Sequence, residues 1–182
     1  MIDPIKYYHL ETFLLQDVRQ RFERDHSIGA FDFFSIIIWK SNRSKTKVAN
    51  RLLTKSKNLN LEQISRKISA DIAQAKTEKE KMKVLIVHWG FKLAIASAIL
   101  TIFYPEKFTI YDYRAAGQVN EGVRLKDKTK FEDIWIGYIV FRAKVFINSI
   151  WRKPTRKGLL FIRKVKNGRF ECRFEYKFSE IE

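Results

Sequence analysis

The stretch VHWGFKLAIASAIL, residues Val87–Leu100, decides the fold that this sequence predicts. Gly90 interrupts one helical pattern, and a second apolar pattern starts at once and runs to Phe103, before Pro105. Ala94 follows Gly90 at a spacing at which small residues let two helices cross closely. We therefore predict two helices joined by a short turn, with backbone N–H groups exposed where the second helix begins. Such a helix start suits a phosphate group.

Further helices are predicted on both sides of this centre. Three isoleucines, each four residues apart, follow Asn60, which is an expected N-cap. Thr77 and Glu80 have the T-x-x-E spacing of a capping box for the next helix. A long helix is predicted over Phe131–Trp151. The run Phe31–Trp39 is too aromatic for a solvated helix, so we expect it in the core.

The two ends of the chain differ in their hydrophobic period. Apolar residues between Leu10 and Phe22 recur at helical spacing, and Gly29 is expected to end that unit. Near the other end, Asn167-Gly168 is the preferred pair for a type I′ turn. Pairing about that turn sets apolar residues opposite each other, Val165 with Phe170 and Phe161 with Phe174. We predict one mainly α domain over residues 1–182, with a helical core (1–152) and a C-terminal β-hairpin (158–179) packed on it.

The chain carries a large positive charge. Lys and Arg number 36 against 20 Asp and Glu, which gives a net charge of +16. Such a charge repels itself in the folded state unless an anionic partner neutralises it. Nucleic acid is the commonest such partner, a membrane surface is an alternative, and basic composition for solubility is a third. The most apolar segment, residues 134–150, is interrupted by Arg142, Lys144 and Asn148. This favours a buried helix, so we expect a DNA partner and no membrane.

Cysteine and histidine are scarce, with one Cys and three His in the chain. The single Cys172 excludes an intramolecular disulfide and any four-cysteine zinc or iron–sulfur site. It is compatible with a reducing cytosol, and the first residues lack the pattern of a signal peptide. We therefore expect a cytoplasmic monomer with no metal and no cofactor.

The passage around Gly90 resembles the helix-hairpin-helix element of the DNA glycosylase superfamily, which includes endonuclease III and the 8-oxoguanine glycosylases. The resemblance extends from Phe31 to Ala115. Lys92 follows the hairpin glycine by two positions, and Asp112, in FTIYDYRA, lies about twenty residues further on, as in the lyase-active members. The resemblance implies a glycosylase-like fold and catalytic roles for Lys92 and Asp112. The cysteines of the iron–sulfur loop of the endonuclease III branch are absent.

The chemistry of these two residue types fits such a reaction. An unprotonated lysine amine forms a Schiff base with the sugar C1′. A carboxylate stabilises the positive charge that develops on the sugar as the base departs, or deprotonates the nucleophile. The target nucleotide first has to leave the duplex. We therefore expect a DNA glycosylase with an AP-lyase step that uses Lys92 and Asp112, the alternative being a non-catalytic DNA- or RNA-binding module on the same fold.

The remaining nucleic-acid contacts are expected from the hairpin and from the cationic segment 40–47, KSNRSKTK. They are His88, Trp89 and Gly90 of the hairpin, Lys40, Arg43 and Lys45 of the cationic segment, and Arg114 close to Asp112. A buried tryptophan followed by a solvated turn explains residues 39–43 nearly as well. Taken alone, Lys92 is an ordinary exposed helix residue, and Asp112 is most often an N-cap.

Overall fold

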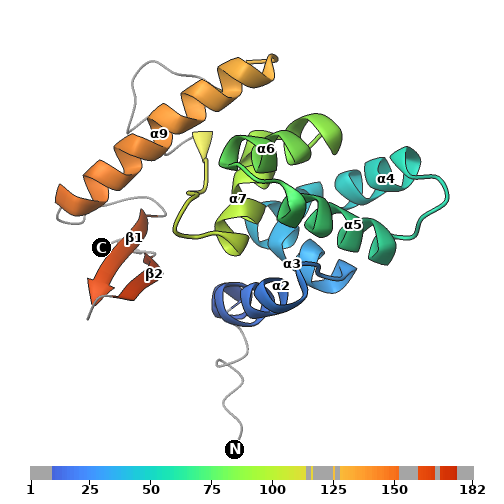
Figure 1. Cartoon of the computed structure of the whole chain (residues 1–182), viewed down its shortest axis with the longest axis horizontal. Coiled ribbons are helices and arrows are strands. Elements are labelled where there is room, and N and C mark those ends of the chain that lie inside the picture. The colour runs from blue at the N-terminus through green and yellow to red at the C-terminus, as the bar shows by residue number, and fades with distance from the viewer. Residues whose placement is uncertain are drawn as a thin grey trace, which may run out of the picture.

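Helices make up most of the chain in this computed structural model (Figure 1). The structure describes residues 10–113, 116, 125, 128–151, 160–166 and 169–175, and describes side chains up to residue 146. The α-helices are α1 (Leu10–Phe13), α2 (Arg19–Asp25), α3 (Ala30–Ser41), α4 (Lys45–Lys55), α5 (Leu61–Gln74), α6 (Glu78–Lys83), α7 (Leu93–Phe103) and α9 (Phe131–Trp151). Two π-helical turns, η2 (Leu14–Val18) and η4 (Val84–His88), and a 3₁₀ turn, η3 (Asn42–Ser44), lie between them. None of the described helices is long and apolar enough to cross a membrane.

The first helical unit ends at His26 and not at Gly29, so the prediction for Gly29 was wrong. His26 has a φ of 52° and is the left-handed C-cap of α2, a conformation in which histidine is enriched. Gly29 instead has an extended backbone and is the N-cap of α3. A Cβ atom at Gly29 would lie 2.6 Å from a carboxylate oxygen of Glu62. A side chain at this position would therefore displace the Glu62 carboxylate from the N–H of Ala30.

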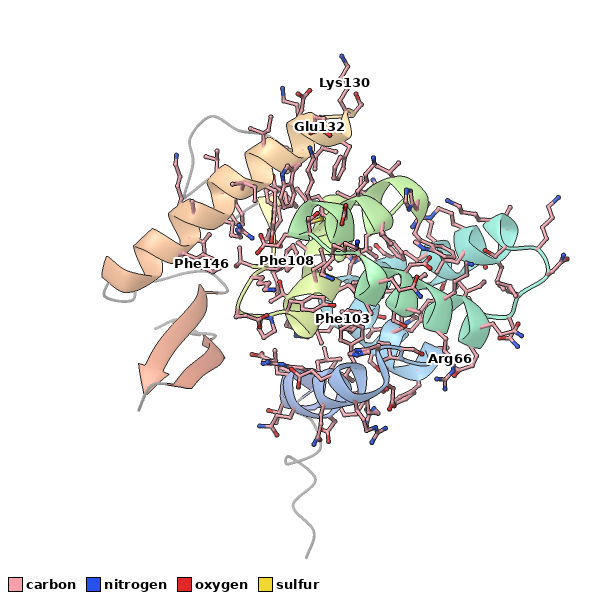
Figure 2. The ribbon with its side chains drawn as sticks, viewed as in Figure 1. Arg66, Phe103, Phe108, Lys130, Glu132 and Phe146 are labelled. Carbon is pink, nitrogen blue, oxygen red and sulfur yellow. The ribbon has the colours of Figure 1, made fainter. Side chains whose placement is uncertain are left out.

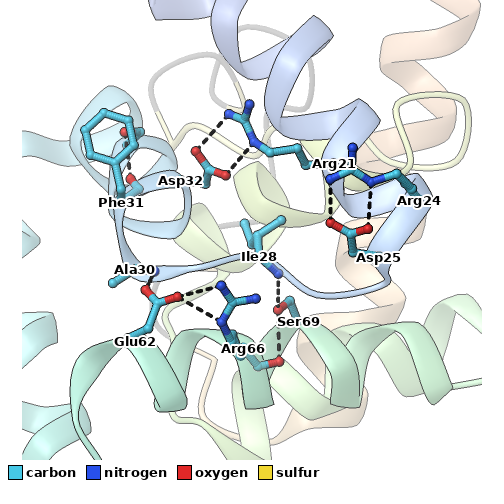
Figure 3. A network of polar contacts seen from close by, with 11 residues as sticks. Arg21, Arg24, Asp25, Ile28, Ala30, Phe31, Asp32, Glu62, Arg66 and Ser69 are labelled. Carbon is cyan, nitrogen blue, oxygen red and sulfur yellow. Dashed lines mark hydrogen bonds and ion pairs between the residues drawn. The ribbon is translucent and has the colours of Figure 1, made fainter.

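Polar contacts tie α2, α3 and α5 together at this junction (Figure 3). Besides the contact of Glu62 with the first turn of α3, the hydroxyl of Ser69 in α5 accepts the N–H of Ile28 at 2.9 Å. Arg21 of α2 binds both carboxylate oxygens of Asp32 at 2.8 and 2.9 Å. Asp32 lies in the first turn of α3, where a negative charge is favourable. These contacts fix where α3 starts, and hence where its last turn lies.

The core is centred on α3 and α7, which pack against each other. Phe33, Ile36 and Ile37 of α3 are fully buried, whereas Phe31 is 77% exposed. The expectation that the whole run is in the core was thus wrong for Phe31. The reason is helical geometry, since α3 buries one face and Phe31 lies on the other. All residues of α7 except Ala94 are buried.

An aromatic stack joins α2 to the C-terminal end of α7. The ring centroids of Phe22 and Phe103 are 3.8 Å apart, and the two ring planes differ by 5°. The ring of Tyr104 meets Phe22 edge-on at 5.6 Å. Figure 2 labels Phe103 between α7 and the N-terminal helices. The stack therefore fixes the C-terminal end of α7, which is the end opposite the turn at Gly90.

Two predicted helix starts are confirmed. The side chain of Asn60 accepts the N–H of Gln63, and the side chain of Gln63 accepts the N–H of Asn60, so α5 begins with a complete capping box. Thr77 and Glu80 form the same arrangement at α6. Hydrogen bonds from the backbone N–H groups of Thr77 and Lys76 lower the pKa of the Glu80 carboxyl group.

Helix α9 has the predicted bounds and packs against α6. Arg142 of α9 pairs with Glu78 and also donates to the carbonyl of Lys107. The strands β1 (Leu160–Lys166) and β2 (Arg169–Glu175) pair antiparallel, with Val165 opposite Phe170 and Phe161 opposite Phe174. Residues 167 and 168 lie outside the described residues, so the type I′ turn stays a prediction, as does the packing of the hairpin on the helices.

Candidate active site

The turn at Gly90 joins two helices, as predicted. Turn η4 ends at His88 with Trp89 as its C-cap, and Gly90 follows with a φ of +71°, which glycine adopts readily because it has no Cβ. The N–H of Phe91 donates to the carbonyl of Leu85 at 2.8 Å and closes the turn. Lys92 is the N-cap of α7, and its side chain does not cap the helix. The start of α7 is thus left without a side-chain cap.

Exposed and buried residues alternate along this turn. The exposed residues are His88, Gly90 and Lys92. Trp89 is 6% exposed, and its indole N–H donates to a carboxylate oxygen of Asp71 at 3.1 Å. The prediction that Trp89 contacts nucleic acid was wrong, because the ring is part of the core and its polar atom already has a partner within the protein.

Two cations of α4 lie over the buried aromatic rings of the turn. The ammonium group of Lys55 donates to the carbonyl of His88 and lies 5.8 Å from the ring centroid of Trp89. The guanidinium carbon of Arg51 lies 5.3 Å from the ring centroid of Phe91. The sequence analysis missed both residues, since their partners are more than thirty residues away in the chain. The turn is therefore lined by cations from α4.

The segment that follows α7 returns alongside this helix, so that Asp112 comes to lie near its first half. The hydroxyl of Ser97 accepts the N–H of Tyr111 at 2.9 Å, which fixes the residue before Asp112 against the first half of α7. Lys92 precedes Ser97 by five residues, or about 7.5 Å of helix rise. The backbone carbonyl of Asp112 accepts the N–H of Ala116, consistent with the predicted turn of helix. Lys92 therefore precedes the half of α7 against which the residue before Asp112 is fixed.

A second support for this segment comes from α9. The hydroxyl of Tyr138 accepts the N–H of Thr109 at 3.0 Å and donates to the carbonyl of Thr109 at 2.8 Å. Both residues are buried, and burial raises the pKa of the Tyr138 phenol. Ser97 and Tyr138 are positioning residues that the sequence analysis missed. The signal in the sequence was a hydroxyl within a mainly apolar helical pattern, Ser97 in one helix and Tyr138 in the other.

Replacing Tyr138 with Phe is expected to lower the free energy of unfolding by about 1–3 kcal/mol, because it leaves the buried N–H and C=O of Thr109 without a partner. Urea denaturation followed by far-UV circular dichroism measures the change. Tyr104→Phe is the matched control, since it removes a hydroxyl from a partly exposed tyrosine at the start of the same segment. Equal midpoints for the Tyr138→Phe variant and the unaltered protein would contradict the expectation.

Asp112 forms an ion pair with Lys40, the last lysine of α3. The Nζ of Lys40 lies 3.0 Å from Oδ2 of Asp112, across 72 residues of sequence. The side chain of Lys40 is only 11% exposed, whereas that of Asp112 is 43% exposed. Lys40 was expected as a nucleic-acid contact on the surface, and it is instead largely covered and bound to Asp112. Lys92 makes no ion pair with any residue that the structure describes.

The ion pair between Lys40 and Asp112 lies at the end of α3, and the turn at Gly90 precedes α7, which packs against α3. The rings of Phe33 in α3 and Phe91 in the turn meet at 6.0 Å between centroids. Lys40 is seven residues beyond Phe33, about 10 Å along α3 and two helical turns from it, so it lies on the same face. The site thus extends from the turn to the end of α3, with Asp112 facing solvent on one side and Lys40 on the other.

The other predicted contacts lie around this site or beyond the described chain. Arg43 and Lys45 are exposed and follow directly after α3, and Lys45 donates to the side chain of Asn42 at 2.7 Å. Arg114 lies outside the described residues. Among the described residues, no group of three His, Cys, Asp or Glu side chains is arranged to hold a metal ion.

A hollow of about 540 Å³ lies on another side of the turn. Its walls come from α5, α6 and η4 and include Asp71, Glu80, Lys83 and His88, but neither Lys92 nor Asp112. Charged side chains of both signs line it, so it does not favour the binding of an anion.

No protein-family model, curated protein or solved structure matches this chain. The assignment of function therefore depends on the residues of the site itself.

Proposed function

We propose that this protein binds DNA and excises a damaged or modified base from it, with an AP-lyase step after excision. The observation that supports the proposal is the environment of Asp112. Its carboxylate side chain is 43% exposed and lies in a segment fixed against the first half of α7, the helix that starts at an uncapped, cation-lined turn. Such a carboxylate, open to a substrate on one side, stabilises positive charge on a sugar as the base leaves.

The proposed reaction needs an amine and a surface for the extruded base. The resemblance to the glycosylases gives the amine to Lys92, which is exposed at the start of α7. Tyr113 follows Asp112 directly and is 57% exposed, and an aromatic ring at the edge of such a site stacks with an extruded base. An enzyme of this kind takes its target nucleotide out of the duplex before the reaction.

The turn is the proposed phosphate anchor. Backbone N–H groups at the start of α7, the ammonium of Lys55 at the His88 carbonyl and the exposed Lys92 are all available to one phosphodiester group. The exposed cations Arg43 and Lys45 extend this basic surface beyond the end of α3. The net charge of +16 supports binding to a polyanion.

DNA affinity is expected to fall steeply as salt rises. The logarithm of the association constant should decrease with the logarithm of salt concentration at a slope of about −0.9 for each phosphate contacted. Fluorescence anisotropy of a labelled duplex, titrated at several KCl concentrations, measures this slope.

Variants of single lysines test where the phosphates are bound. Lys55→Gln and Lys92→Gln should each make the slope about one unit shallower, since each removes one phosphate contact. Lys130→Gln is the matched control, because Lys130 is exposed at the start of α9 (Figure 2), away from the turn. An affinity that does not change with salt would overturn DNA binding altogether.

A non-catalytic DNA- or RNA-binding module is the second candidate. The ion pair between Lys40 and Asp112 favours it, because a carboxylate neutralised by a lysine is a weaker partner for a sugar cation. Single-turnover incubation with duplexes that each carry one lesion, analysed with and without alkaline treatment, separates the two. Strand breaks after alkali indicate base excision, and breaks without alkali add the lyase step. Salt-dependent binding with no breaks in either arm supports the binding module.

A further inference from the structure

The amine that contacts Asp112 is that of Lys40, not that of Lys92. A nucleophile and its base are recognised by hydrogen-bond distance between them, about 2.6–3.2 Å. The Nζ of Lys40 meets this criterion with Oδ2 of Asp112 at 3.0 Å. Lys92 is exposed and has no ion pair or hydrogen bond from its ammonium group to the described residues.

We propose that Lys40 is the amine that forms the Schiff base with the sugar. The inference rests on the proposed function and changes the residue that carries its lyase step. Lys40 is largely covered along its side chain, so its ammonium group is already held at the carboxylate. Holding a reacting group in position removes part of the entropic cost of the reaction. Lys92, which is solvated, keeps the role of a phosphate contact at the turn.

The covalent step balances with Asp112 as the proton carrier. The Lys40 ammonium transfers one proton to Asp112, and the nitrogen lone pair attacks C1′ of the ring-opened sugar aldehyde. The former carbonyl oxygen takes up the second proton from nitrogen and then the proton held by Asp112, and leaves as water. The products are a protonated imine at Lys40 and one water molecule, and Asp112 is again a carboxylate.

A purely structural role for the ion pair makes a different prediction. If Lys40 only joins α3 to the segment 104–113, an arginine at that position preserves the charge and the contact with Asp112. Arginine has no amine that forms a Schiff base, because its guanidinium stays protonated. Lys40→Arg therefore keeps the ion pair but removes the reactive amine, and Lys40→Gln removes both.

The experiment is borohydride trapping of the full chain on a duplex with one abasic site. Borohydride reduces the imine to a stable amine, so the adduct is counted on a denaturing gel. Lys40→Gln and Lys40→Arg should lose the adduct, whereas Lys92→Gln should still form it when the duplex is saturating, since it loses only a phosphate contact. Lys130→Gln is the matched control, an exposed lysine at the start of α9 that has no role in the proposed site. Digestion of the trapped unaltered protein, followed by mass spectrometry, should find the sugar on Lys40.

The outcomes separate the two proposals. An adduct on Lys92, or an adduct that persists in Lys40→Arg, overturns the role of Lys40 and leaves the lyase step standing. Absence of any adduct from the unaltered protein overturns the lyase step, and with it the role of Lys40. The mass spectrum is obtained on the unaltered protein, so the assignment holds or fails even if a Lys40 variant does not fold.

Discussion

Asp112→Asn is expected to lower the rate of base excision by about 10²–10³, the range found when one electrostatic stabiliser is removed from an active site. Asparagine keeps the shape of the side chain and an oxygen that accepts a hydrogen bond from Lys40. The backbone carbonyl of residue 112 still accepts the N–H of Ala116. The negative charge that we propose stabilises the sugar cation is lost, so the chemical step should slow while fold and DNA affinity are retained.

Single-turnover excision with the lesion duplex that the unaltered protein cleaves best measures this change. Asp133→Asn is the matched control, because Asp133 is an exposed aspartate in the first turn of α9. It should excise at the unaltered rate. An Asp112→Asn variant that excises as fast as the control would remove Asp112 from the mechanism, even with normal DNA binding.

Phe103→Ala is expected to lower the free energy of unfolding by about 3–5 kcal/mol, as for other buried phenylalanines. The change removes one ring of the stack with Phe22 and leaves a cavity at the end of α7. This end of α7 has no role in the proposed site. The molecules of the variant that remain folded should therefore still bind DNA. Urea denaturation gives the free energy, and anisotropy at low temperature gives the affinity.

Phe31→Ala is the control for this variant, since it removes the same side chain from a position that is 77% exposed. Its effect should stay within about 0.5 kcal/mol. A loss at Phe31 as large as that at Phe103 would mean that Phe31 is covered in solution, and the packing of α3 described above would then be incomplete.

Features set by neighbouring residues were predicted well from the sequence. The bounds of α9, the N-caps Asn60 and Thr77 and the turn at Gly90 depend on residues within a few positions of each other. The resemblance also singled out Asp112, whose preceding residue is fixed at Ser97 in the half of α7 that begins at the turn. Short-range interactions were sufficient to predict these elements. Each depends on the spacing of a few neighbouring residues or on the backbone conformations open to one residue.

Features that depend on distant partners were not predicted. Trp89 is buried because Asp71 accepts its N–H, and Lys40 is covered because Asp112 meets it from 72 residues away. Gly29 serves a carboxylate from α5 and not the end of its own helix. A pattern of charges along the chain does not show which cations find a carboxylate after folding, so the basic segment 40–47 was assigned to the surface as a whole.

The hydroxyls of Ser97 and Tyr138 hold the segment 104–113, and the ribosome adds these two residues at different times. Ser97 precedes the segment in the chain, but Tyr138 follows Thr109 by 29 residues. At about 5–20 residues per second, a ribosome needs about 1–6 s to add those residues. During that interval the nascent chain already contains the turn, Lys40 and Asp112, while the polar groups of Thr109 are still open to water. A chain truncated before α9 thus contains Lys40 and Asp112 but lacks the Tyr138 hydroxyl that binds the backbone of Thr109.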